Sequence, residues 1–151
     1  MSIDFMVFDP ASAPRSPRAF RAWYREETDW PDNYDASAAS LLSGPAIQSW
    51  YREMTARFPD SNQPRADPRA IDEIYGDYNF TRHICYAAFQ PRIADEAWAL
   101  TRTLAAEHGL GTYDPNSDDE RNNNCIQFPD GPLSPDAPMR GGIFSFFRRK
   151  S

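Results

Sequence analysis

One amphipathic helix with strand patterns on both sides constrains the fold of this chain more than any other feature. From Ile93 to His108, apolar and small residues recur at steps of three and four, which places them on one helical face. Gly109 follows where a helix commonly ends in the left-handed conformation. Tyr78–Phe89 before the helix and Leu110–Tyr113 after it are typical of strands. A strand–helix–strand order requires a sheet on which the helix can pack.

Further strand patterns occur near both ends of the chain. Ile3–Phe8 is short and rich in β-formers, and its last residues are apolar on both faces, as in a central strand. Cys125–Phe128 is typical of a last short strand before a Pro–Asp–Gly turn. The stretch Tyr78–Phe89 is either one long strand or two short strands broken near Arg82. Read as a single strand, it has one face made of Tyr78, Phe80, Ile84, Tyr86 and Ala88.

Two further helices are predicted in the first half of the chain. Ser16–Pro17 is typical of a helix start, because proline suits the first helical turn, and this helix should run to about Thr28. Gly44–Pro45 opens the next helix in the same way, and Pro59 ends it. The residues between the two helices, 29–43, are predicted to be a loop.

The order strand, helix, helix, strand, helix, strand, strand predicts an α+β domain. We expect a ferredoxin-like (split βαβ) antiparallel sheet with helices packed on one face, which leaves the second face open. Residues 1–131 should form this single domain. Residues 132–151 are predicted to be a flexible Pro/Gly-rich, basic and aromatic C-terminal tail.

The charge of the chain is unevenly distributed. The net charge is −6, but residues 1–139 hold all 22 acidic residues and only 12 of the 16 basic ones, a balance of −10. A strongly acidic body argues against nucleic-acid binding, for which a basic patch is the usual footprint. It permits a basic protein partner, because complementary charge accelerates encounter and selects partners, and the alternative is that the acidic surface only keeps the protein soluble.

Cysteine content and the N-terminal residues favour a cytoplasmic protein. The two cysteines suit free thiols in a reducing compartment. Met1–Phe8 carries no basic residue, unlike a signal or transit peptide. No apolar run approaches the ~20 residues that a membrane-spanning helix requires.

The motifs of the common catalytic and cofactor sites are absent from the sequence. There is no glycine-rich phosphate loop and no G-x-S-x-G elbow. His83 and Cys85 lie two residues apart and could bind zinc with Cys125 or His108, or act as base and nucleophile. The sequence has no C-x-x-C pair and no third orienting residue beside them, so we predict no catalytic residue, cofactor or metal site.

Acidic residues and aromatic residues gather in two loops. Between residues 26 and 51 there are five acids and no Lys or Arg. The acids after Tyr113 could bind calcium, but their spacing is not that of an EF-hand, and a solvated loop is favoured. Aromatic anchors among steering charges suit a protein interface. The predicted partner-binding residues are Trp30, Asp32, Tyr34, Asp35, Asp118, Asp119 and Glu120.

The last eleven residues combine phenylalanines with a basic end. Phe144, Phe146 and Phe147 precede the basic residues 148–150. Such a tail can contact anionic membrane, dock on its own acidic body or stay disordered, but it offers too little apolar area for stable anchoring.

Five stretches together resemble a group of small bacterial proteins. They are IDFMVFDP, FRAWYREETDW, DYNFTRHICYAAF, ADEAWALTRTLAAEHGLGTYDP and IQFPDG, within residues 1–131. Members of this group resemble immunity proteins of polymorphic-toxin systems. The resemblance implies a non-catalytic cytoplasmic protein that neutralises a delivered toxin, with a basic toxin domain as partner. The alternative is a small-molecule-binding or regulatory domain with a pocket lined by Tyr78, Arg82 and Tyr86.

Overall fold

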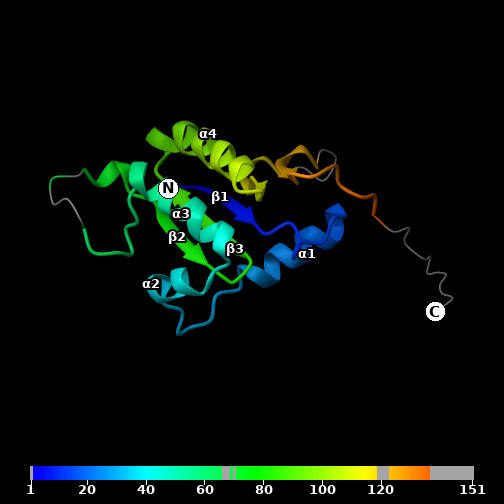
Figure 1. Cartoon of the computed structure of the whole chain (residues 1–151), viewed down its shortest axis with the longest axis horizontal. Helices are drawn as coiled ribbons and strands as arrows, with labels where there is room; N and C mark the ends of the chain where they lie inside the picture. The colour runs from blue at the N-terminus through cyan, green and yellow to red at the C-terminus, as the bar shows by residue number, and fades with distance from the viewer. Residues whose placement is uncertain (1, 66–68, 70, 119–122, 137–151) are drawn as a thin grey trace.

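The computed structural model describes residues 2–65, 69, 71–118 and 123–136, and it contains one antiparallel sheet with helices around it (Figure 1). The strands are β1 (Ile3–Phe8), β2 (Asp77–Phe80), β3 (Ile84–Phe89), β4 (Gly111–Tyr113) and β5 (Ile126–Gln127). The α-helices are α1 (Pro17–Glu27), α2 (Ala36–Ala39), α3 (Pro45–Arg57) and α4 (Pro91–Glu107). Short 3₁₀ turns are η1 (Ser40–Leu42), η2 (Asp72–Ile74), η3 (Pro115–Ser117) and η4 (Asn123–Cys125). The predicted α+β class is confirmed.

β1 is the central strand of the sheet. The strands lie in the order β2–β3–β1–β4–β5, and every neighbouring pair is antiparallel. β1 pairs with β3 along its whole length, from Ile3 opposite Phe89 to Phe8 opposite Ile84, and its second half also pairs with β4. The prediction of a central strand from residues that are apolar on both faces is therefore confirmed.

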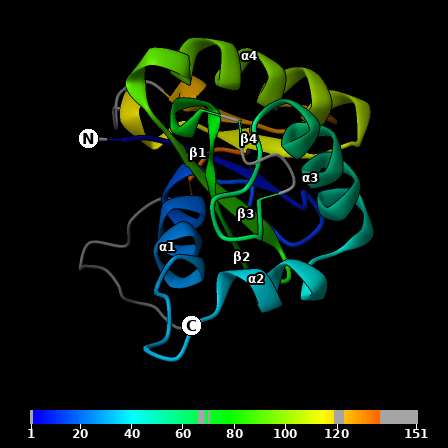
Figure 2. The same ribbon diagram turned by 90° about the vertical axis from the view of Figure 1, so that its left-hand side faces the viewer.

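Helices cover both faces of the sheet, so the prediction that they pack on one face is wrong (Figure 2). On one face, Phe5 of β1 stacks on Trp98 of α4 with ring centroids 4.5 Å apart. On the other face, Phe8 of β1 meets Phe20 of α1 edge to face at 5.0 Å. Successive strand residues point to opposite faces, so β1 contributes to two separate cores. The face that the sequence left open is occupied by α1.

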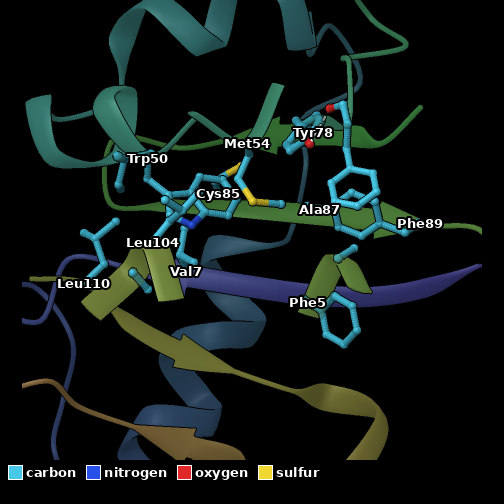
Figure 3. Close-up of a cluster of buried hydrophobic side chains, with 14 of the residues drawn as sticks. Phe5, Val7, Trp50, Met54, Tyr78, Cys85, Ala87, Phe89, Leu104 and Leu110 are labelled. Carbon is cyan, nitrogen blue, oxygen red and sulfur yellow. Dashed lines mark hydrogen bonds between the residues drawn. The ribbon is translucent and has the colours of Figure 1, made fainter. Parts of the chain in front are cut away.

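Figure 3 shows the core between the sheet and the layer of α3 and α4. Trp50 and Met54 of α3 and Leu104 of α4 are buried with Cys85 of β3. The indole N–H of Trp50 donates to the carbonyl of Thr101 at 3.2 Å, so the buried polar atom of this ring has an acceptor. Full burial of a large apolar side chain stabilises a fold by about 1.5–3 kcal/mol. This cluster therefore fixes α3 and α4 against the sheet.

Proline and glycine set the ends of the helices. α1, α3 and α4 begin at Pro17, Pro45 and Pro91, where the missing proline N–H would have no intrahelical acceptor. Ser16 precedes α1 as predicted, but its side chain makes no capping hydrogen bond. Gly109 has a φ of +68°, the left-handed conformation predicted for the residue after α4.

The stretch from 78 to 89 is a hairpin, which decides between the two alternatives left by the sequence. β2 ends at Phe80 and β3 begins at Ile84, and the N–H of Thr81 donates to the carbonyl of Ile84 at 3.1 Å. The turn changes the phase of the alternation. Tyr78 and Phe80 therefore share a core with Cys85, and the single-strand interpretation that grouped them with Ile84 is wrong.

β2 lies at one edge of the sheet, and side chains bond its outward-facing backbone groups. The N–H of Phe80 donates to the hydroxyl of Tyr34 at 2.6 Å. The amide of Asn62 donates to the carbonyl of Tyr78 at 3.3 Å, and the carboxylate of Asp60 accepts a bond from the N–H of Tyr78. These bonds occupy groups to which a strand of another chain could otherwise pair.

The first residues beyond the predicted domain boundary at Gly131 are hydrogen-bonded to the backbone at the start of α1. The N–H of Ser134 donates to the carbonyl of Arg15 at 2.9 Å. The carboxylate of Asp136 accepts from the N–H of Arg18 at 2.8 Å. Residues 137–151 of the predicted tail lie outside the described residues.

Candidate functional site

The acidic loop of the sequence forms a continuous stretch of surface, which we call the acidic segment (residues 26–42). It leaves the C-terminal end of α1, passes through α2 and η1, and ends before α3. Its five acidic residues have no Lys or Arg among them, and four of the five are exposed: Glu26, Asp29, Asp32 and Asp35. The structure also corrects the prediction of a loop at 29–43, because α2 and η1 lie within it.

Two aromatic side chains attach the acidic segment to the sheet. The rings of Trp30 and Tyr34 lie 4.9 Å apart, and Trp30 packs against the core on the α1 face, 6.5 Å from Tyr86. Tyr34 bonds the edge of β2 through its hydroxyl, and partial burial raises the pKa of this phenol. Both predicted anchors are only partly exposed, so they support the segment as well as lining its surface.

Asp35 caps α2, whereas Asp32 lies on the exposed turn before it. The carboxylate of Asp35 accepts from the hydroxyl of Ser37 at 2.8 Å and from the N–H groups of Ser37 and Ala38 at 3.0 and 3.4 Å. These bonds, the Ser37 hydroxyl first, lower the pKa of Asp35. Asp35 therefore has a structural role as well as an exposed charge.

Sequence analysis missed a strongly exposed apolar feature of the described surface. Leu41 and Leu42 are 78% and 71% exposed, and with Ile71 they are the large hydrophobic residues that stand out from the described surface. The side-chain amide of Gln48 donates to the carbonyls of Leu41 and Ser43, at 3.2 and 2.8 Å, and holds this turn against α3. The available signal was two consecutive leucines in a stretch without helical or strand periodicity.

Asp118, the third predicted acidic position, is bound within the protein. Its carboxylate accepts from the Nε and Nη2 of Arg21 at 2.9 and 2.6 Å and from the hydroxyl of Tyr113 at 2.7 Å. The guanidinium of Arg21 is the main cause of a lowered pKa at Asp118. The side chain is only 21% exposed. Asp119 and Glu120 lie outside the described residues.

The structure thus separates the two groups of predicted residues. Trp30, Asp32, Tyr34 and Asp35 form one surface beside β2, and Asp118 lies between α1 and β4. The rings of Tyr86, Tyr24 and Tyr113 form a chain of contacts between these places, at 6.2 and 4.8 Å. Asp114, the first acid after Tyr113, caps η3.

A serine, a histidine and an aspartate meet after β1, but not in the arrangement of a hydrolytic triad. The Nδ1 of His83 lies 3.1 Å from the Oγ of Ser12, which donates to the carboxylate of Asp9 at 2.9 Å. In a triad the carboxylate bonds the second nitrogen of the histidine ring. Here it bonds the serine and also the N–H of Ala11, so the cluster closes a turn.

The cysteines do not join His83. Cys85 is 0% exposed, and burial raises the pKa of its thiol well above the ordinary value, which keeps it protonated. Cys125 belongs to the core on the opposite face of the sheet. The zinc arrangement of His83 with these two cysteines is therefore not formed, and a Cys85 nucleophile would have no access to a substrate.

The pocket considered for small molecules is not formed by Tyr78, Arg82 and Tyr86. Tyr78 is fully buried in the α3–α4 core, and Tyr86 packs on the α1 face. A hollow of about 420 Å³ lies elsewhere, between α4 and the β4–β5 end of the sheet. Its lining includes Trp98, Arg102 and Asp114.

Comparison of the chain with protein-family models, curated protein sequences and solved structures found no match. None of the helices that the structure describes combines the length and hydrophobicity needed to cross a membrane. Function is therefore inferred from the residues and their geometry.

Proposed function

We propose that this is a non-catalytic protein that binds a basic protein partner through the acidic segment. The observation that carries the proposal is the exposed pair Leu41 and Leu42 in the same segment as exposed carboxylates. Apolar side chains at the centre of an interface supply most of its affinity, and surrounding charges steer the approach. Capping by Asp35 and the bond from Tyr34 to the sheet hold the surface in one shape, which reduces the entropic cost of association.

The partner that we propose is a basic toxin domain, which would make this protein a cytoplasmic immunity protein. Two features support this. The body of the chain carries a balance of −10, which complements a basic domain. The five sequence stretches that resemble this group of immunity-like proteins also include all five strands and parts of α1 and α4.

We further propose that the sheet is a ferredoxin-like unit with additions. The chain contains β1, α3, β2, β3, α4 and β4 in this order, with α1 and the acidic segment inserted between β1 and α3. The four strands lie in the order β2–β3–β1–β4. β3 lies between β1 and β2, as in a split βαβ unit. On this interpretation, α1, the acidic segment and β5 are added to a common scaffold, and functional surfaces often occur on such additions.

A small-molecule-binding role is the second candidate, and the hollow beside α4 favours it. Its volume lies within the range of about 300–1,000 Å³ that is typical of ligand sites. The ring of Trp98 and the guanidinium of Arg102, which lies 5.3 Å from that ring, could stack on a planar anionic ligand.

Affinity capture with matched variants tests the proposed function. Tagged protein would be used to capture partners from its own host, with the Leu41→Ser/Leu42→Ser double variant and Asp32→Lys in parallel. Asp95→Lys on α4 makes the same charge change away from the acidic segment and serves as the control. We expect one stoichiometric basic partner that the wild type and the control retain and that the double variant loses. Burial of each leucine contributes about 1.5–3 kcal/mol, so the double variant should bind at least ~100-fold more weakly.

Three results would count against the proposal. Retention of the partner by the leucine variant would exclude this surface as the interface. Failure of the captured domain to harm cells when expressed without this protein would exclude the immunity role. Absence of any partner for folded, abundant protein would favour the hollow beside α4, to be tested by thermal shift with a ligand panel.

A further inference from the structure

Three side chains that commonly bind metals meet where α3 and α4 cross. Glu53 lies on α3, Glu107 is the last residue of α4, and His108 follows it as the C-cap. One ligand atom from each of the three lies within 4.8 Å of the others. The Nε2 of His108 is in direct contact with the Oε2 of Glu53. This cluster joins residues 55 positions apart, and none of the residues belongs to the acidic segment.

The two helices hold this corner in place. Near one end of their contact, Arg57 on α3 pairs with Glu96 on α4 at 2.5 Å. About one turn of α3 before Glu53, the indole of Trp50 donates to the backbone of α4 in the buried core. At the other end, the N–H of His108 donates to the carbonyl of Leu104 at 3.0 Å, which fixes the backbone that carries the imidazole. The helix backbones that carry the three side chains are therefore held in place.

The chemistry of the cluster suits a divalent cation. Two carboxylates bring two negative charges together, and the neighbouring guanidinium of Arg57 is bonded to Glu96. One imidazole with two carboxylate ligands is a donor set used for Zn²⁺, which takes three protein ligands when one position remains open. Bonds of about 2.0–2.2 Å would place the ligand atoms roughly 3.3 Å apart, and exposed glutamates can close that distance by rotation.

We propose that Glu53, Glu107 and His108 form a Zn²⁺ site that links α3 to α4. The fourth coordination position faces outward and is filled by water or by a side chain of a second molecule. Binding of the ion stabilises the folded chain, because the ligands meet only in the native structure. The plain alternative is an ion pair between His108 and Glu53, which forms when the imidazole is protonated and binds no metal. This proposal is independent of the proposed function.

Zinc titration of the untagged full chain tests the site. Protein freed of metal with a chelator would be titrated with zinc chloride by calorimetry in a buffer that does not coordinate zinc. We expect one equivalent to bind with a dissociation constant near or below about 10 µM and to raise the melting temperature. Glu107→Gln and His108→Asn should each weaken binding at least tenfold. Glu96→Gln, on the same helix but outside the cluster, should bind as the wild type does.

Cobalt provides a spectroscopic test of the same geometry. Addition of Co²⁺ should give the strong visible absorption of a four-coordinate ion, and Zn²⁺ should remove it. Circular dichroism would verify that each variant is folded, and Glu107 is exposed, so its substitution leaves the packing intact. The proposal is overturned if no saturable binding occurs at about 100 µM metal. It is equally overturned if folded Glu107→Gln and His108→Asn bind zinc as tightly as the wild type.

Discussion

The contact between Arg21 and Asp118 offers the most direct test of how this fold is held together. Asp118→Asn keeps the size of the side chain and removes its charge. The wild-type carboxylate accepts bonds from two nitrogens of Arg21 and from the hydroxyl of Tyr113. The two charged side chains are only 15% and 21% exposed. Removing one partner therefore leaves the guanidinium of Arg21 largely shielded from water and without its counter-charge.

The expected loss follows from these contacts. A hydrogen bond to a charged group is worth about 1.5–3 kcal/mol, and an asparagine retains part of the network, so we expect a loss of about 2 kcal/mol at neutral pH. For a domain of this length, this corresponds to a fall of roughly 4–8 °C in melting temperature. The exposed pair of Arg15 and Asp130 provides the control, because Asp130→Asn should change the melting temperature little.

The pH dependence of the Asp118→Asn effect gives a second, independent readout. Arg21 lowers the pKa of Asp118 below the ordinary value of 3.8, so the folded protein holds the proton less tightly than the unfolded chain does. The stabilisation that the charge of Asp118 provides is therefore present above the ordinary pKa of 3.8, and it is lost as the pH falls through the lower pKa of Asp118 in the folded state. Melting curves followed by circular dichroism should show a wide gap between wild type and variant at pH 7 and a narrower one near pH 3. An unchanged melting temperature at pH 7, or an equal gap at both pH values, would refute the reasoning.

Three further changes test other parts of the structure. Burial raises the pKa of Asp60, so the contribution of this residue to stability is greatest below its ordinary pKa and declines as the pH rises through its pKa in the folded state. The melting temperature of Asp60→Asn should therefore improve relative to that of the wild type between pH 3 and pH 7. A constant difference in melting temperature would contradict this. Tyr34→Phe removes the acceptor for the N–H of Phe80 and should cost about 1 kcal/mol in urea denaturation, whereas an unchanged midpoint would show that water replaces the hydroxyl. Gly111→Ala places a methyl group against the buried ring of Phe8 and should destabilise the protein by about 1–3 kcal/mol, and a wild-type midpoint would mean that the ring moves aside.

The contribution of Asp32 and Asp35 to partner binding can be separated from the role of Asp35 in capping α2. Reversing both Asp32 and Asp35 would combine loss of charge with loss of the α2 cap. Asp35→Ser removes the charge and keeps a capping oxygen, so it separates partner binding from local unfolding. A double variant Asp32→Lys/Asp35→Ser should weaken capture of the basic partner and melt within a few degrees of the wild type. A large fall in melting temperature would mean that the cap requires the carboxylate.

Most regular elements could be predicted because their signals are local. Ile3–Phe8 matches β1, and the prolines at 17 and 45 mark the starts of α1 and α3. The two-sided apolar pattern of Ile3–Phe8 also indicated that both faces of the central strand are covered. The one-face prediction ignored this signal, although a strand that buries both sets of side chains requires a layer on each side.

The candidate site was less predictable because its contacts are long-range. Composition marked residues 26–42 as acidic, but no local pattern shows that Tyr34 would bond Phe80, 46 residues away. Asp118 was grouped with the interface by its charge, and its pairing with Arg21, 97 residues away, has no sequence signature. The contact between Glu53 and His108 also joins residues far apart in the chain, so no local sequence pattern predicts it. Leu41 and Leu42 were overlooked because exposure depends on the packing of the whole fold.

The bond between Tyr34 and β2 constrains how a partner can engage. The hydroxyl of Tyr34 in the acidic segment occupies one backbone N–H at a sheet edge, so a partner that pulled the segment away would expose a donor able to pair with another chain. A mode of recognition in which the segment unfolds and wraps around its target would therefore promote self-association. Rigid-body docking avoids this self-association because the segment stays folded. The rate of encounter should then depend on ionic strength and should not depend on a folding step of the segment. If the proposed function holds, the same bond that orders the surface therefore favours rigid-body docking.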